Sequence, residues 1–139
     1  MSRAATITDG LAAGAVAAVL SGAPSTLYAL ATRASPLEAT LAAGTLLLPR
    51  ERRPLVLALA AVPIHIVLSL GWAVLLAAVL PRRRTVAYAT LAGLAIAALD
   101  LGVVGRRVPR IRALPLLPQV LDHVAYGATV GAVLRARRR

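Results

Sequence analysis

The sequence predicts an all-α polytopic membrane protein, in which four transmembrane helices form a bundle with one short interfacial or re-entrant helix. Three observations lead to this fold class. The chain of 139 residues is 59% hydrophobic, whereas soluble domains are about half apolar. Most of its charged residues are basic, with 16 basic and 5 acidic residues. It also contains four long apolar stretches without arginine, and none alternates like a lipid-facing β-strand.

The four apolar stretches have the length of membrane-spanning helices. About 20 helical residues cross the hydrocarbon core of a bilayer. The spans are expected at about residues 10–31, 55–80, 85–104 and 118–134. The second span is long enough to tilt or kink, and Pro63 provides a place for a kink because it removes a backbone donor. The fourth span is short and needs flanking residues to complete its crossing.

A fifth helix is expected at about residues 36–48, between the first two spans. Ser35 has the position of an N-cap, Pro36 the first helical position and Glu38 the third, which together form a typical helix start. The apolar run that follows stops at Pro49, too early to cross a bilayer. The helix is therefore interfacial or re-entrant. The proline-rich segment 108–118 is expected to be an irregular interfacial loop.

Every basic residue is arginine, and all 16 lie outside the predicted spans. The long arginine stem lets a guanidinium at a helix end reach lipid headgroups, where each is worth about 1 kcal/mol against an anionic leaflet. Three Tyr, one Trp and no Phe are too few aromatic rings for stacking nucleic-acid bases. We therefore expect anionic lipids, and not nucleic acid, as partners. The arginines assigned to headgroups are Arg82, Arg83, Arg84, Arg106, Arg107, Arg137, Arg138 and Arg139.

The arginines do not predict an orientation in the membrane. With four spans, the end that carries the two termini and residues 82–84 has eight arginines. The other end, with residues 33–53 and 106–112, also has eight. The positive-inside rule therefore favours neither orientation. Either a partner or the first span sets the orientation, or copies insert both ways and pair antiparallel.

Small residues recur at helical spacing and predict close helix packing, which drives association in lipid. The first span has one at every fourth position, and the last span repeats the pattern. The third span offers Ala89, Gly93 and Ala97. The residues assigned to packing in the first and last spans are Gly10, Gly14, Ala18, Gly22, Gly127 and Gly131.

Polar side chains within the spans form the candidate functional site, because such groups usually face the protein interior. The predicted intramembrane cluster is His65, Asp100, Gln119, Asp122, His123 and Tyr126. The last four lie along one side of a helix. The cluster either fixes packing through interhelical hydrogen bonds or carries a proton. Asp9, just before the first span, is expected to cap it.

Cofactors and catalysis have little support in the sequence. His65 and His123 lie on different spans and could share a haem, but neither belongs to a local ligand motif. We assign no metal site and no cofactor. The chain has no cysteine and none of the common nucleotide-binding, hydrolase or metalloprotease motifs. The protein is therefore expected not to be an enzyme.

The run from Pro118 to Gly127, PQVLDHVAYG, followed by Gly131, resembles the last helix of small bacterial inner-membrane four-helix proteins of the YagU-like group. This resemblance implies a multi-pass inner-membrane location and offers no catalytic residues. The arginine-only, alanine-rich composition is typical of a GC-rich genome, such as that of an actinobacterium.

Three functions follow from these observations. The first is a small non-enzymatic protein of the bacterial cytoplasmic membrane, acting as an accessory subunit or a homo-oligomer with a polar Asp/His interior. The second is a minimal transporter or channel that uses the same groups to move protons or a small ion. The third is a b-haem electron-transfer subunit.

Overall fold

The computed structural model of the chain describes residues 3–138, and Arg139 lies outside them. These residues form helices and turns without a strand, which confirms the all-α prediction. The helices are α1 (Arg3–Leu20), α2 (Ala23–Ala31), α3 (Glu38–Gly44), α4 (Pro54–Val79), α5 (Thr85–Leu99), α6 (Pro109–Arg112) and α7 (Leu116–Arg137). A π-helical turn, Asp100–Val104, and a 3-10 turn, Gly105–Arg107, continue α5.

Three helical stretches of the described chain are long and apolar enough to cross a membrane. They are Arg3–Ala31, Pro54–Val79 and Thr85–Arg107, at the places of the first three predicted spans. Pro63 lies inside α4, which continues through it. The fourth predicted span corresponds to α7, which does not join the other three because Gln119, Asp122 and His123 lower its hydropathy.

The first apolar stretch differs from the prediction because it is broken into two helices. A turn at Ser21 and Gly22 separates α1 from α2. Pro24, in the first turn of α2, has no N–H to donate to the carbonyl of Leu20, so one hydrogen bond of the helical ladder is missing at the break. Gly22 was assigned to packing, but a Cβ at this position would meet nothing within 4 Å, because it lies at the break.

The short helix α3 is also shorter than the predicted 36–48. The Ser35 hydroxyl accepts a hydrogen bond from the N–H of Leu37 at 3.3 Å, which makes a turn where the helix was expected to start. The helix therefore begins at Glu38 and ends at Gly44, followed by turns. Segment 108–118, expected to be irregular, contains the short helix α6.

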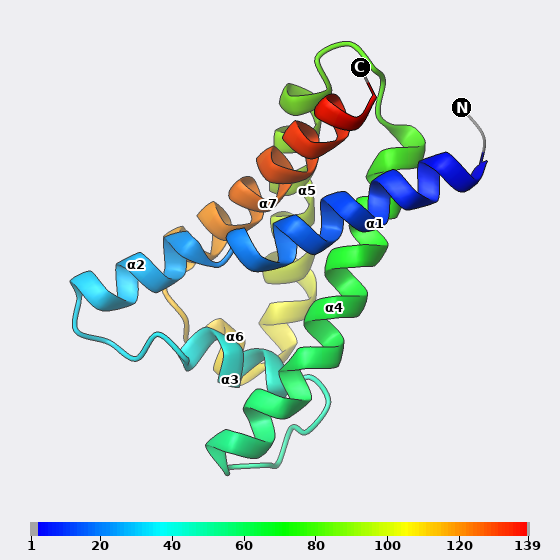
Figure 1. The fold of residues 1–139 in the computed structure, drawn as a ribbon. Coiled ribbons are helices and arrows are strands. Elements are labelled where there is room, and N and C mark those ends of the chain that lie inside the picture. The colour runs from blue at the N-terminus through cyan, green and yellow to red at the C-terminus, as the bar shows by residue number, and fades with distance from the viewer. Residues whose placement is uncertain (1–2, 139) are drawn as a thin grey trace.

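Helix α7 runs beside α5 and α1 (Figure 1) and contacts α1, α2, α4 and α5. Between Pro118 and Leu134, only Leu121 and Ala132 are exposed. Helix α1 packs between α7 and α4, and α3 packs against the first half of α4. Both ends of the described chain lie near the α4–α5 turn, whereas α3 and α6 lie at the opposite end of α4 and α5.

Glycines allow the helices to approach each other closely at two interfaces. Between α1 and α4, a Cβ on Gly10 would lie 2.6 Å from the Cα of Val74. Between α5 and α7, a Cβ on Gly131 would lie 2.7 Å from the Cα of Val86. Real side chains do not approach this closely, so both positions require glycine. Gly14 faces α4, and Gly127 faces Gly93 of α5, in the same way.

Candidate functional site

Asp122 of α7 caps the N-terminus of α2 from across the bundle. Its Oδ1 accepts the backbone N–H of Ser25 at 2.9 Å. Ser25 lies in the first turn of α2, where backbone N–H groups have no partner within the helix. A carboxylate there also meets the positive end of the helix dipole. Asp122 therefore satisfies a polar group that the break in the first span leaves open.

His65 of α4 bonds to the other side of the same break. Its Nε2 lies 2.8 Å from the carbonyl oxygen of Ala18, in the last turn of α1. A carbonyl only accepts hydrogen bonds, so Nε2 carries a proton, and in the neutral tautomer with this proton Nδ1 is an acceptor. The His65 side chain is exposed on the described chain. The two helices of the broken apolar stretch, α1 and α2, are thus held by side chains from two other helices.

His123 and Asp100 link α7 to the end of α5. The His123 Nδ1 lies 2.8 Å from the Gln119 carbonyl oxygen, so it carries a proton. The Nε2 faces Asp100 Oδ2 at 3.4 Å. Either a protonated imidazole faces a carboxylate, or a carboxylic acid donates to a neutral ring. The contact therefore joins two titratable groups from different helical segments. Asp100 begins the π-helical turn, and both side chains remain partly exposed, at 22% for His123 and 30% for Asp100.

The six predicted polar residues do not bond as one cluster. Tyr126 is buried and donates its hydroxyl to the carbonyl of Ser69 in α4. Gln119 contributes its backbone carbonyl, while its side chain has no hydrogen bond within residues 3–138. From α7, Asp122 reaches α2, His123 reaches α5 and Tyr126 reaches α4. Neighbouring positions on one helix thus bind three different helices.

The remaining acidic residues form ion pairs near the helix ends. Asp9 Oδ1 accepts from Arg137 Nε at 2.8 Å, which joins α1 to the end of α7. The predicted capping role of Asp9 is not observed, because α1 begins earlier, at Arg3. Glu38 accepts two bonds from Arg110, at 2.8 and 3.2 Å, and the Glu38 carboxylate raises the pKa of Arg110.

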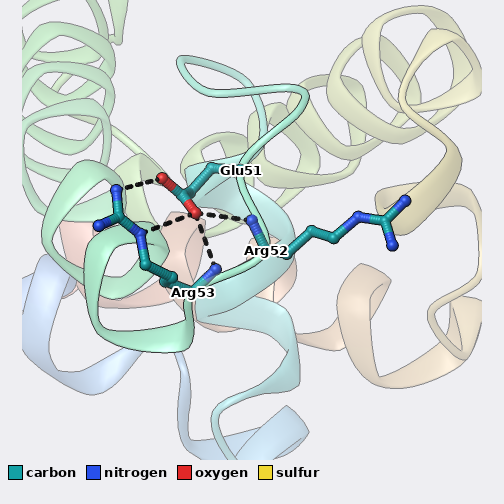
Figure 2. A network of polar contacts seen from close by, with 3 residues as sticks. All are labelled: Glu51, Arg52 and Arg53. Atoms are coloured by element: carbon teal, nitrogen blue, oxygen red, sulfur yellow. Dashed lines mark hydrogen bonds and ion pairs between the residues drawn. The ribbon is translucent and has the colours of Figure 1, made fainter.

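Glu51 organises the loop before α4 (Figure 2). It accepts bonds from the backbone N–H groups of Arg52 and Arg53 and from the Arg53 guanidinium. The guanidinium first, and then the two backbone groups, lower the pKa of Glu51 to about 2. The carboxylate is thus ionised at neutral pH and fixes the turn that leads into α4.

The arginines assigned to lipid headgroups divide into two groups. Arg82, Arg83 and Arg84 lie in the α4–α5 turn, and Arg106 and Arg107 lie in the 3-10 turn. Arg137 and Arg138, at the end of α7, make side-chain contacts to other helices. The first pairs with Asp9, and the second donates to the backbone carbonyls of Ala77 and Leu80. They differ from the prediction because α7 ends beside α1 and α4.

The shared haem considered for His65 and His123 does not fit the hydrogen bonding. Both ring nitrogens of His123 face oxygen atoms, and Nε2 of His65 is bonded to Ala18. Ligation of iron by His123 would require one of these contacts to break. The described residues also contain no group of three or more His, Cys, Asp or Glu arranged to hold a metal ion.

The partners of the polar side chains were missed by the sequence analysis. Ser25, Ala18 and Ser69 contribute backbone atoms, which leave no side-chain signal. The one available signal was Gly22 followed by Pro24, which marks a helix break. Comparison with protein-family models, with curated proteins and with solved structures found no match for the chain. The resemblance of the last helix to the YagU-like group therefore stays a prediction.

Proposed function

We propose that the protein is a small non-enzymatic integral membrane protein that acts as a subunit, either of a homo-oligomer or of a larger membrane complex. One observation carries this proposal: Asp122, His123 and His65 each bond to a different neighbouring helix. Polar groups committed to joining helices favour a scaffold over a catalyst. In the proposed scaffold they hold a broken first span in place.

The proposal includes four membrane crossings, with α7 as the fourth. Helix α7 has 22 residues, about 33 Å, which matches the hydrocarbon thickness. Its polar residues face other helices, so they do not oppose insertion. An even number of crossings also agrees with the Asp9–Arg137 pair, which holds both ends of the chain together. A bacterial cytoplasmic membrane, with its anionic leaflet, suits the arginine-rich helix ends.

Two substitutions of Asp122 separate a scaffold from a proton carrier. Asp122→Asn keeps an acceptor oxygen for Ser25 and loses the charge, whereas Asp122→Leu loses both. For a scaffold, we expect the Asn variant to retain near-normal membrane abundance and native mass, and the Leu variant to lose abundance. Native mass spectrometry after mild extraction gives the assembly state, and immunoblotting gives the abundance. Normal abundance of the Leu variant would contradict the proposal.

A second candidate function is proton-coupled transport, favoured by the contact between the two titratable side chains of His123 and Asp100. In this case His123→Gln, which keeps a polar group, would assemble normally and lose pH-driven flux in proteoliposomes. A scaffold predicts no such flux in the unaltered protein. Proton flux carried by the unaltered protein and lost in His123→Gln would establish this second function.

A further inference from the structure

One stripe of α4 has the spacing of a helix–helix seam, and the other helices of this chain cover only part of it. The stripe consists of His65, Leu68, Trp72, Leu75 and Val79, which recur at alternating intervals of three and four residues. Leu68, Leu75 and Val79 are 45%, 48% and 63% exposed, and His65 is exposed as well. Trp72 is half-buried, because one side of its ring packs against the core of the bundle. Such a heptad pattern suits a second helix packed along α4.

Two polar groups on this stripe have unmet hydrogen-bonding capacity. The Nδ1 of His65 is an acceptor, because Nε2–H is donated to Ala18. The indole N–H of Trp72 is a donor, and no residue within 3–138 accepts from it. His65 is the twelfth of the 26 residues of α4, near the middle of the helix. In a membrane, an exposed polar nitrogen at this depth is costly and calls for a protein partner.

We propose that the partner is a second, inverted copy of this chain, packed α4 against α4. An antiparallel pair with its two-fold axis between Leu68 and Ser69 brings His65 of each copy opposite Trp72 of the other. The two-fold symmetry then places the Nδ1 acceptor of each His65 opposite the indole N–H donor of a Trp72. A parallel pair instead opposes acceptor to acceptor and donor to donor.

The charge distribution supports an inverted partner. The two ends of the four-span topology carry eight arginines each, so neither orientation is excluded by the positive-inside rule. An inverted pair needs both orientations in one membrane, which an unequal distribution would prevent. This inference rests on the membrane insertion in the proposed function and adds the identity of the partner and of the contact surface.

Single-cysteine variants test the pairing in native membranes, because the chain has no cysteine of its own. Leu68→Cys lies beside the two-fold axis and is expected to give an oxidative cross-linked dimer. Val67→Cys is the matched control, since it is equally lipophilic but lies 100° around the helix, and it is expected to stay monomeric. Val79→Cys should also stay monomeric, since its two copies would be about 30 Å apart along the seam.

Trp72→Phe in the Leu68→Cys background tests the polar contacts. It keeps the ring but removes both donors from the dimer, and self-association should weaken about fivefold to tenfold. Four results would each overturn the inverted pairing. Three concern cross-linking: Leu68→Cys fails to cross-link, Val67→Cys cross-links as well as Leu68→Cys, or Val79→Cys cross-links efficiently. The fourth is unchanged self-association of the Trp72→Phe variant. If one of these results is obtained while the protein remains integral to the membrane, the proposed function is not contradicted. Release of the protein by alkaline carbonate would overturn the proposed function itself.

Discussion

At the residue scale, the hydroxyl of Tyr126 provides a clean test of a buried interhelical hydrogen bond. Tyr126→Phe keeps the ring that fills the core and removes only the donor to the Ser69 carbonyl. We expect a loss of about 0.5–1 kcal/mol in the free energy of unfolding, measured by titration with SDS. Tyr88→Phe, at an exposed ring, should be neutral. Equal effects of the two substitutions would contradict a specific role of the Tyr126 bond.

Glu51 allows a prediction about pH at the same scale. Its pKa in the folded chain, about 2, lies below the ordinary value of 4.5. Its contribution to stability is therefore fully present above about pH 4.5 and is lost as the pH falls toward 2. Arg53→Gln removes the largest cause of the shift, so the pKa should rise toward 4.5 but stay below it, because the backbone donors remain. NMR titration of the carboxyl carbon measures this change.

A neighbouring arginine provides the control for this titration. Arg50→Gln removes a nearby positive charge that makes no bond to Glu51, and it should leave the pKa close to 2. A pKa of Glu51 that does not move in Arg53→Gln would show that the network in Figure 2 does not hold the carboxylate.

The residues of the candidate site could be predicted from the sequence, but their partners could not. Asp122, His123 and His65 stand out because charged and titratable groups are rare in apolar stretches. Their partners include backbone atoms of Ser25 and Ala18, which any residue type could provide. Only the fold decides which backbone groups lie near a side chain. A sequence pattern can therefore identify an unusual polar side chain, but not the backbone group to which that side chain bonds.

At the scale of helices, the position of an apolar helix was predictable where prolines or arginines bound the apolar run. Helix α4, at Pro54–Val79, lies within one residue of the expected 55–80 at each end. The break between α1 and α2 was not predicted, because no charged residue interrupts the apolar stretch at Ser21 and Gly22, while Pro24 removes a backbone hydrogen bond. Hydropathy reports burial in lipid, whereas helix continuity depends on backbone hydrogen bonds.

The α5–α7 interface depends on glycines, and two matched substitutions test this dependence. Gly131→Ala introduces a Cβ 2.7 Å from the Cα of Val86 and 2.8 Å from the Cβ of Ala89, so the helices must move apart. We expect a loss of about 1–3 kcal/mol. Gly71→Ala meets nothing within 4 Å, and should be neutral or slightly stabilising, because alanine favours the helix. SDS titration of both variants measures the difference, and a neutral Gly131→Ala would contradict close packing.

At the scale of the whole molecule, four of the five acidic residues connect segments that are distant in the sequence, whereas Glu51 bonds to its neighbours Arg52 and Arg53. Asp9 pairs with Arg137 where the two ends of the chain meet, and Glu38 pairs with Arg110 at the opposite end. Asp100 and Asp122 lie between these pairs and bond to His123 and α2. The few negative charges are thus used within the chain, and most of the arginines are left to face the surroundings.

The balance of arginines between the two ends should therefore control how the whole molecule inserts. Replacing Arg83 and Arg84 by glutamine leaves six arginines at the end with the termini and eight at the other. The positive-inside rule then predicts one orientation, with the termini outside. Replacing Arg106 and Arg107 instead removes the same charge from the other end and should place the termini inside. A cysteine introduced at exposed Ala136 reports the orientation through its reaction with a membrane-impermeant maleimide.

The same two double variants also connect orientation to assembly. If the proposed dimer is an inverted pair, each variant places all copies in one direction and should lose the Leu68→Cys cross-link. Combining the two double variants restores the balance, with six arginines at each end, and should restore cross-linking in spite of four lost charges. Loss of the cross-link in all three proteins would mean that the arginines themselves are needed for pairing, whereas its retention in both unbalanced variants would mean that the two copies lie parallel.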